Sequence, residues 1–491
     1  MFLLKKTSIF ILLLIATAVL MFLSAIIGVI LENFIEARSF FYFGLLILLI
    51  SLFLAFASFN RALSSPIRSQ ILVAISSFII FPLIFTLPLL SLLPELDKHT
   101  LYFEMVSAFT TTGLTGIYTL SEISDTILFW QALVAWFGGL LIWTFYFSIF
   151  ASLDINDIFM IYGNRREIEK KNYETEQAHH TEVFLNAFIS ICLPYIILTL
   201  VLWGFLLATG DDTFVALIYS MSTMSTSGIS PYGSELNSVN YLGLLAIFVF
   251  LLFAINSSSL FWFKSIKLNR KIFISTELDI AIKLIVLSSI ILSIIYFQKY
   301  YSYDSILTAI LRNVFICLSF LTTTGWHLEA IFQLHTNHFS LVLIGLALIG
   351  GGIGTTAGGL KLLRFVIMQR HLRSEFSKMV YPSVIRTSES RMKLNDSIIL
   401  KVWVFFSTFI FFIVVSFCCL SLLGMSMMDA MILSISTFSN TGPLYDVIIP
   451  SSSFYEEISV TIKYVLIIGM VLGRIEILVL FALFNTELWR R

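Results

Sequence analysis

Charged residues are scarce in this sequence of 491 residues. Only 12% of them are Asp, Glu, Lys or Arg, whereas 58% are hydrophobic and 48 are phenylalanines. Roughly a quarter of the residues of a soluble globular protein are charged, so the composition excludes a soluble fold. The net charge is zero, and no long basic tail indicates a nucleic-acid partner. The chain is therefore predicted to be an integral membrane protein.

Cysteines and nucleotide-binding motifs are also scarce. The four cysteines all lie within apolar segments, in spacings typical neither of disulfides nor of metal sites, so we expect them to be small packing residues. The sequence has no Walker loop and no dinucleotide-binding fingerprint. It therefore predicts no cofactor in this chain, and any control by nucleotides must come from another chain.

Long apolar stretches, by contrast, are plentiful. A helix needs about 20 apolar residues to cross a bilayer core of about 30 Å. Ten stretches reach this length, near residues 8–31, 39–58, 69–93, 126–150, 183–208, 240–263, 278–297, 339–370, 398–423 and 458–484. The first follows Lys5 and Lys6 as a signal peptide would, but it continues to about residue 31 without an obvious cleavage site, so we expect a span there.

Four half-length apolar segments alternate with the later spans. They lie near residues 101–109, 213–224, 305–321 and 429–438. Segments this short predict re-entrant helices. The predicted fold class is an all-α polytopic membrane protein, in which four tandem repeats of span, pore helix and span have a pseudo-fourfold arrangement after an N-terminal pair of spans. The predicted domains are 1–68 for that pair and 69–153, 154–270, 271–395 and 396–491 for pore repeats one to four.

Basic residues gather in alternate loops. The basic loops contain Arg61 and Arg68, Arg165 to Lys171, Lys264 to Lys271, and Lys361 to Lys393. The positive-inside rule places these loops in the cytoplasm. Because an even number of spans separates the two termini, both termini are predicted to be cytoplasmic, and all four half-length segments enter the membrane from outside.

One seven-residue pattern ends every half-length segment. Its copies are Ser107 to Gly113, Ser222 to Gly228, Ser319 to Gly325 and Ser436 to Gly442, each with three hydroxyl or amide residues before the final glycine. Non-helical backbone at membrane depth is tolerated only where protein buries it or water reaches it, so four such loops indicate a shared pore. Glycine permits backbone conformations closed to other residues, and rings of carbonyls can replace the hydration shell of a cation. The pattern predicts a filter without fixed charge.

Acidic residues lie near the start of the half-length segments, namely Glu95, Asp97, Asp212, Asp304 and Asp429. They could form a vestibule that attracts cations, or they could be N-caps of the pore helices. The two interpretations are compatible.

Several motifs are specific enough to indicate a family. They are TTTGLTG at 110–116, STSG at 225–228, TTTGW at 322–326, SNTGP at 439–443, GGGIGTTAGGLKLLR at 350–364 and GRIEIL at 473–478. With them the sequence resembles the Trk/Ktr/HKT superfamily of potassium transporters, in particular its Trk-type membrane subunit, over nearly the whole chain. The resemblance implies potassium uptake across a bacterial cytoplasmic membrane. It assigns potassium binding to Thr111, Thr112, Gly113, Thr226, Ser227, Gly228, Thr323, Thr324, Gly325, Asn440, Thr441 and Gly442.

The resemblance also implies partners. It predicts a homodimer in the lipid bilayer and a cytoplasmic, ring-forming, nucleotide-binding regulatory subunit that docks on the basic segments 154–182 and 361–393.

A glycine-rich segment interrupts the eighth predicted span. It contains Gly350, Gly351, Gly352, Gly354, Thr355, Thr356, Gly358 and Gly359. Each glycine costs a helix roughly 1 kcal/mol, so we expect the helix to break and the segment to act as a gate, as it does in the family. A nucleotide-binding loop is excluded because no Gly-Lys-Ser/Thr ending follows. A close-packed helix remains the alternative.

Arg474 lies deep in the last predicted span. A charge at that depth is costly unless it faces water or protein, so Arg474 is a candidate for a functional role. Below the filter it would repel cations, with the glycine-rich segment as its partner. Pairing with Glu476 is the alternative, although residues two apart on a helix do not face each other.

Other polar residues give weaker signals. His327, His335 and His338 could bind a metal, but loop histidines without a cysteine or a placed carboxylate are more often solvated, so potassium is the only metal ion we predict. Arg312 lies within the third half-length segment, where snorkelling or packing against an acid are the two interpretations.

Two functions of different classes fit these features. The first is potassium uptake through a single-chain filter with four loops, either as a gated channel or as a symporter. The second is an intramembrane enzyme with a Ser or Thr nucleophile. The enzyme needs one distinctive nucleophile and a base, whereas the sequence has four near-equivalent loops and no histidine within a predicted span. The repetition favours conduction.

Overall fold

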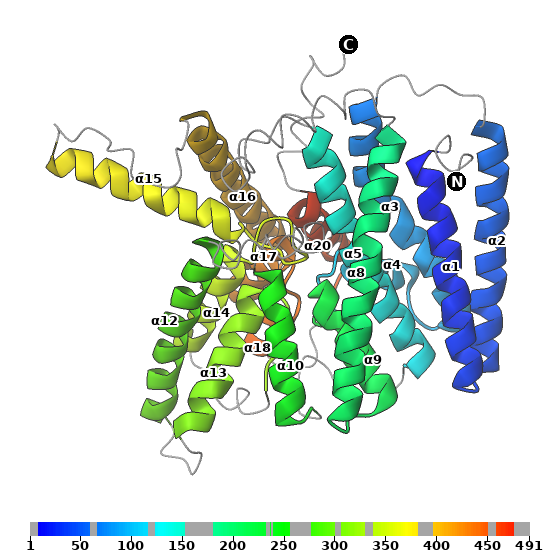
Figure 1. Cartoon of the computed structure of the whole chain (residues 1–491), viewed down its shortest axis with the longest axis horizontal. Coiled ribbons are helices and arrows are strands. Elements are labelled where there is room, and N and C mark those ends of the chain that lie inside the picture. Colours follow the sequence, from blue (N-terminus) through cyan, green and yellow to red (C-terminus); the bar gives the residue numbers. More distant parts are fainter. Residues whose placement is uncertain are drawn as a thin grey trace, which may run out of the picture.

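The computed structural model describes residues 8–58, 66–115, 123–152, 180–231, 236, 239–255, 276–299, 306–328, 337–381, 396–449 and 458–475. Over these residues the chain is almost entirely helical, and most of the helices run side by side in one bundle (Figure 1). The predicted all-α polytopic fold is confirmed. Seven of the described helices are long and apolar enough to cross a membrane.

The first two helices form the predicted N-terminal pair. Helix α1 (Ile9–Ile30) packs along α2 (Phe34–Ser58), and α1 also contacts the first repeat. A Cβ atom added at Gly28 would lie 3.1 Å from the Cβ of Ala37, so small residues let the two helices approach closely at their connection. Most of the large side chains of α2 are exposed, as expected for a helix that faces lipid.

Each repeat consists of a long first helix, a half-length pore helix and a second helix. The helices of repeats one and two are α3 (Pro66–Leu92), α4 (Lys98–Phe109), α5 (Asp125–Ser152), α8 (His180–Ala208), α9 (Thr213–Ser225) and α10 (Tyr241–Leu251), the last extended by the 3-10 turn η2 (Leu252–Ala254). Those of repeats three and four are α12 (Thr276–Lys299), α13 (Ile306–Leu321), α14 (Asn337–Ile349), α16 (Asp396–Leu422), α17 (Met427–Ser439) and α20 (Val460–Ile475).

The repeats pack in a closed cycle. The second helix of each repeat contacts the pore helix of the next, in the pairs α5 with α9, α10 with α13, α14 with α17 and α20 with α4. The last pair joins the fourth repeat to the first, which closes the cycle. This is the pseudo-fourfold arrangement predicted from the tandem repeat, and it brings the C-terminal ends of all four pore helices to the centre of the bundle.

The pore helices begin with different capping contacts. Asp212 is the N-cap of α9, and its side chain accepts hydrogen bonds from the amides of Phe214 and Val215. In α17 the N-cap is Ser426, so of the two interpretations of Asp429 the N-cap is wrong, and Asp429 is the third helical residue. The Ser426 hydroxyl accepts from the Asp429 amide, which is the N-cap bond, and it donates to the Asp429 carboxylate.

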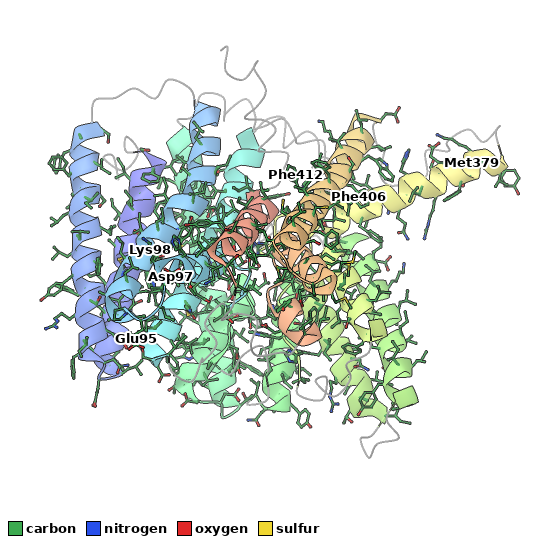
Figure 2. All side chains as sticks on the ribbon, turned by 180° about the vertical axis from the view of Figure 1, so that it is seen from behind. Glu95, Asp97, Lys98, Met379, Phe406 and Phe412 are labelled. Carbon is green, nitrogen blue, oxygen red and sulfur yellow. The ribbon has the colours of Figure 1, made fainter. Side chains whose placement is uncertain are left out.

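The first and third pore helices complete this comparison. Asp97 occupies the N-cap position of α4 without a side-chain capping bond, and it lies beside Glu95 and Lys98 at the exposed start of the helix (Figure 2). The predicted residue Asp304 lies outside the described residues.

The second helices of repeats two and three end earlier than the predicted spans. The clearest case is the eighth predicted span, 339–370, which was expected to be interrupted by glycines. Helix α14 ends at Ile349 and α15 (Leu362–Val380) begins only after the glycine-rich segment, so the predicted break is confirmed. Helix α10 ends within its predicted span, and the part of the tenth span beyond Ile475 lies outside the described residues.

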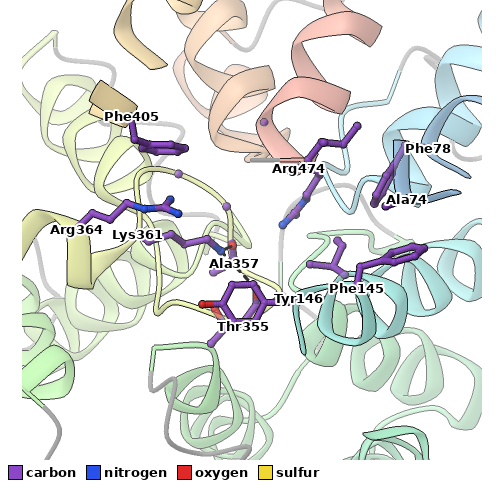
Figure 3. A pocket seen from close by; sticks show the side chains of 15 residues that line it. Ala74, Phe78, Phe145, Tyr146, Thr355, Ala357, Lys361, Arg364, Phe405 and Arg474 are labelled. Carbon is purple, nitrogen blue, oxygen red and sulfur yellow. Dashed lines mark hydrogen bonds between the residues drawn. The ribbon is translucent and has the colours of Figure 1, made fainter. Parts of the chain in front are cut away.

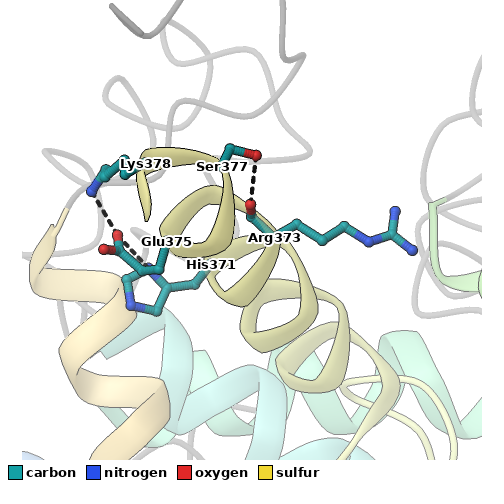
Figure 4. Close-up of polar contacts among 5 residues, drawn as sticks. All are labelled: His371, Arg373, Glu375, Ser377 and Lys378. Atoms are coloured by element: carbon teal, nitrogen blue, oxygen red, sulfur yellow. Dashed lines mark hydrogen bonds and ion pairs between the residues drawn. The ribbon is translucent and has the colours of Figure 1, made fainter. Parts of the chain in front are cut away.

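Helix α15 projects away from the bundle (Figures 1 and 2). It occupies residues assigned partly to the end of the eighth predicted span and partly to the basic segment 361–393, for which no separate helix was predicted. Its exposed polar side chains pair with one another, since Glu375 contacts both His371 and Lys378 within one turn (Figure 4). Its far end, near Met379, is exposed.

The capping contacts give a test of the fold. Replacing Asp212 with Ala removes the carboxylate that accepts from the amides of Phe214 and Val215, so we expect the free energy of unfolding to fall by about 1 kcal/mol. Asp97→Ala is the matched control, because Asp97 has the same position on α4 but makes no capping bond. Thermal unfolding of the detergent-solubilised protein measures both, and equal losses would contradict this account.

Candidate functional site

The four predicted filter loops share one backbone structure. In each, the amide of the sixth residue donates to the carbonyl of the first serine, and the amide of the fifth donates to the carbonyl of the second residue. The bonds to the serine are Thr112 N to Ser107 O at 2.9 Å, Ser227 N to Ser222 O at 3.1 Å, Thr324 N to Ser319 O at 2.9 Å and Thr441 N to Ser436 O at 2.9 Å. This pair of bonds defines the Schellman motif, which ends a helix by satisfying its last carbonyls.

Hydroxyl groups repeat within the loops as well. The fourth and sixth residues of every copy are hydrogen-bonded to each other through their side chains. The oxygen distances are 2.8 Å for Thr110 and Thr112, 3.1 Å for Ser225 and Ser227, 3.1 Å for Thr322 and Thr324, and 3.2 Å for Ser439 and Thr441. The hydroxyls that the sequence pattern singled out thus brace the turn.

The fifth residue of each loop has a left-handed backbone. The φ angles are 51° at Thr111, 54° at Thr226, 60° at Thr323 and 53° at Asn440. Asparagine adopts this conformation readily, but a β-branched threonine does so rarely and at a cost of about 1–3 kcal/mol. All four residues are fully buried. Strain repeated at equivalent buried positions is typical of a functional site rather than of an ordinary helix end.

The final glycines bring the loops into mutual contact. A Cβ atom added at any of them would collide with the next loop in the cycle. It would lie 1.8 Å from Ser227 O at Gly113, 2.3 Å from Thr324 O at Gly228, 2.9 Å from Pro443 Cβ at Gly325 and 2.2 Å from Leu114 N at Gly442. Only glycine allows these approaches, and together they close a ring of four loops.

Hydrogen bonds join adjacent loops at two of the four contacts in the ring. Between the fourth and first loops, the Gly442 amide donates to the Thr112 carbonyl at 2.7 Å, and Asn440 Nδ2 donates to Thr112 Oγ1 at 2.9 Å. Between the third and second loops, Trp326 Nε1 donates to the Gly228 carbonyl at 3.1 Å. The ring is therefore joined by polar contacts between residues far apart in the sequence.

The fourth loop differs from the other three. Gly113, Gly228 and Gly325 have positive φ angles, as the sequence predicted, but Gly442 has φ −56° and ψ −49°. It caps the short helix α18 (Pro443–Ile448), whose first residue contacts the glycines of loops two and three. The prediction that all four glycines adopt special backbone conformations was therefore wrong at Gly442, where glycine is required by the close approach of Leu114.

The glycine-rich segment between α14 and α15 lies against the ring. The Gly358 amide donates to Thr323 Oγ1 at 2.7 Å, and the Thr356 hydroxyl donates to the Met224 carbonyl at 3.4 Å. A Cβ atom at Gly358 would also lie 1.9 Å from the Ser439 carbonyl. The segment thus contacts the second, third and fourth repeats just where their pore helices end.

Arg474 on α20 joins the first loop to this segment. Its guanidinium donates to the carbonyls of Thr110, Thr111 and Thr356 and to the Thr111 hydroxyl. The guanidinium is buried, so these acceptors replace the water that the charge would otherwise bind. Arg474 thus contacts the glycine-rich segment, as the prediction of a partnership requires, while Glu476, the alternative partner, lies outside the described residues.

A small cavity of about 70 Å³ lies beside these contacts (Figure 3). Its lining includes the cationic side chains of Lys361, Arg364 and Arg474 and no acidic side chain. Sequence reasoning missed Lys361 and Arg364, which it assigned to a basic cytoplasmic loop. Both are buried, and Arg364 stacks on the ring of Phe405 at 3.9 Å. Their position directly after the glycine-rich segment was the available signal.

Of the three candidate histidines, only His327 has a described side chain. His327 is buried, and its carbonyl accepts from the Leu236 amide at 3.1 Å. The side chains of His335 and His338 lie outside the described residues. Among the residues that the structure describes, no group of three potential metal ligands occurs.

Known proteins share this architecture. The crystal structure of the potassium transporter TrkH from Vibrio parahaemolyticus aligns over 100% of both chains, with a TM-score of 0.81 and 25% sequence identity. The Trk system potassium uptake protein TrkH of Salmonella typhimurium is 26% identical over 411 residues, which are 81% of this chain and 80% of that protein. The Trk system potassium uptake protein TrkI of Halomonas elongata is 25% identical over 429 residues, 85% of this chain and 82% of that protein.

The fold and the ring define a class of protein, the polytopic membrane transport proteins in which four re-entrant segments of one chain meet at the centre of the bundle. The family model for TrkH, described as a cation transport protein, matches residues 36–490. The chain belongs to this family. It is accordingly a transport protein and not an intramembrane enzyme, which removes the second function considered from the sequence.

The contacts of Gly442 give a test of the ring. In Gly442→Ala the added methyl group would overlap the backbone of Leu114 and Gly113, so we expect a loss of about 1–3 kcal/mol or more in the free energy of unfolding. Gly204→Ala is the control, because a Cβ atom there meets nothing within 4 Å and alanine favours a helix. Comparable stability of the two variants would rule out the close approach between the fourth and first loops.

Proposed function

We propose that this chain mediates potassium uptake across a bacterial cytoplasmic membrane, with the ring of four loops as its selectivity filter. The observation that carries the proposal is the fourfold recurrence of one strained, buried, uncharged turn, closed into a ring by contacts between successive loops. The names of the related proteins, which are potassium uptake proteins, support the choice of ion.

The residues of the ring suit a desolvated cation. Backbone carbonyls and hydroxyls replace an ion's hydration shell without the fixed charge that would bind it too tightly to leave. The filter residues of this proposal are those predicted from the sequence, the fifth, sixth and seventh residues of each loop. No carboxylate lies within the seven residues of any loop, so the loops offer an ion only neutral oxygen ligands.

Arg474 and the glycine-rich segment are the proposed gate. The guanidinium donates to the same kind of acceptor, the loop carbonyls, that a permeating ion would use. A bound cationic side chain therefore competes with an ion for the carbonyls of the first loop and also repels it. Conduction then requires Arg474 to leave these acceptors, and its bond to the Thr356 carbonyl couples that movement to the glycine-rich segment.

The proposal includes the membrane orientation and partners predicted from the sequence. Both termini are cytoplasmic, and the division into an N-terminal pair and four pore repeats is retained. The related proteins are named as parts of a Trk system, which supports a further component. We assign it the role of a cytoplasmic nucleotide-binding subunit that docks on 154–182 and 361–393, where α15 projects from the bundle, and we assign the chain to a homodimer (Figure 1).

Growth complementation tests the function. Expression of the chain, together with a cytoplasmic Trk subunit, should restore growth at low potassium to a bacterium that lacks potassium uptake. Gly113→Ala should abolish the rescue because its methyl group would overlap the Ser227 carbonyl, whereas Gly345→Ala, which meets nothing within 4 Å, should retain it. Failure of the unmodified chain to restore growth, despite its presence in the membrane, would contradict potassium uptake.

Potassium flux into proteoliposomes tests the gate. Arg474→Gln removes the charge that is bound to the first loop, so we expect the flux without any activator to rise by about tenfold or more, the factor that corresponds to losing one charge-assisted hydrogen bond. The control is Lys463→Gln on the same helix, whose ammonium binds Thr100 at 2.7 Å and touches neither the loops nor the glycine-rich segment. An unchanged or lower flux in Arg474→Gln would argue against the gate.

A further inference from the structure

The glycine-rich segment is closed at its base. Its final residues turn back onto the end of α14, where the amides of Leu360 and Lys361 donate to the carbonyls of Leu348 and Ile349 at 3.0 and 2.9 Å, and the Leu362 amide donates to Gly351 at 2.8 Å. These bonds satisfy carbonyls that the end of α14 leaves without helical partners. The segment is therefore a loop with a fixed base and an apex that is free of helical bonds.

Lys361 stands at this base in an unfavourable conformation. Its φ and ψ angles of 76° and 133° lie in a region that is nearly restricted to glycine. Such backbone strain costs about 1–3 kcal/mol and persists only where surrounding contacts enforce it. A glycine at this position would avoid the strain, whereas the lysine side chain makes polar contacts that can offset it.

These contacts are with residues 355–357, which we call the apex of the same loop. The Lys361 ammonium donates to the carbonyls of Thr355 and Ala357, and only 9% of the residue is exposed (Figure 3). A buried ammonium is costly unless polar groups replace its water, and these carbonyls do so. The ammonium thus occupies its own loop in the way that a dehydrated cation occupies a ring of carbonyls.

Lys361 and Arg474 hold alternate carbonyls of one short stretch. The carbonyls of Thr355 and Ala357 accept from Lys361, whereas the carbonyl between them, that of Thr356, accepts from Arg474. The apex therefore lies between two cationic side chains, one from the base of the loop and one from α20. A third contact holds the first half of the loop, because the Ile353 amide donates to the buried carboxylate of Glu277 on α12 at 3.4 Å.

We propose that Lys361 is a positioning residue that holds the glycine-rich loop in the closed conformation, acting together with Arg474. The inference rests on the proposed function of the chain as a potassium pathway. When the ammonium leaves the carbonyls of Thr355 and Ala357, the apex is held by Arg474 alone of the two cations. It can then move out of the conduction path. Lys361 is the N-cap of α15, so movement of α15 would be transmitted to the gate through Lys361.

Potassium flux in proteoliposomes made from the full chain tests this role. Lys361→Gln should raise the flux without an activator by about tenfold, the effect of removing a charge-assisted hydrogen bond, while the preference for potassium over sodium stays unchanged because the filter is intact. Lys361→Arg should keep most of the closed behaviour. Lys361→Gly also lacks the ammonium but suits the backbone angles, so it should fold even if the Gln variant does not, and it should leak equally.

Two comparisons decide between this clamp and a general effect of charge. Arg364→Gln removes a cation from the same cavity, where the Arg364 guanidinium donates to Leu360 O and stacks on Phe405, whereas Lys361 donates to the carbonyls of Thr355 and Ala357. If it raises the flux as much as Lys361→Gln, repulsion alone explains the effect and the clamp is wrong. A double variant of Lys361 and Arg474 should give less than the product of the single effects, because both residues hold one apex.

The outcomes separate this inference from the proposed function. The role of Lys361 would be wrong if Lys361→Gln and Lys361→Gly show the same low flux as the wild type while Arg474→Gln conducts potassium. The proposed potassium pathway would be unaffected by that result. Absence of potassium flux in every variant, including Arg474→Gln, would refute the pathway itself. Loss of the preference for potassium in Lys361→Gly would show a disturbed filter and would also overturn a role confined to the loop.

Discussion

Backbone amides and carbonyls that leave a helix inside a membrane must find partners within the protein, because lipid offers none. This constraint governs the centre of the bundle. Each pore helix ends in a Schellman motif that satisfies its last carbonyls, and a pair of hydroxyls braces the turn. Further carbonyls, in the first loop and in the glycine-rich segment, accept hydrogen bonds from two buried cations, Arg474 and Lys361. The strained residues, the glycines and the buried charges are all consequences of placing irregular backbone at this depth.

The sequence predicted the periodic part of this structure well. Pore helices were located within a few residues of their observed bounds, because apolar length and the serine-to-glycine pattern are local signals. The break after α14 was likewise readable from the density of glycine. The role of each residue within a loop could not be predicted. The same hydroxyl residue types form the hydrogen-bonded pair and also occupy the left-handed position. Which one a threonine becomes depends on hydrogen bonds that form only when the helix ends.

The contacts between loops were beyond sequence reasoning for another reason. Asn440 and Thr112 are 328 positions apart, and nothing in their local sequences indicates that they meet. Lys361 was misassigned because a lysine followed by further basic residues normally indicates a cytoplasmic loop. Its burial follows from the return of the chain onto α14, which places the side chain inside the loop that precedes it. Contacts between residues far apart in the sequence therefore determine the roles of these residues, and composition does not reveal such contacts.

The fourth loop has a consequence for how such a pore can be encoded. Pro443 packs against the glycines of two other loops. Gly442 before it has a negative φ angle, unlike the other three glycines, and is the N-cap of α18. A channel assembled from four identical subunits would have to repeat this proline around the axis, where four copies would compete for the same space. Joining the quarters in one gene removes that demand. Each quarter can then acquire substitutions that suit its own neighbours, and departure from symmetry becomes heritable.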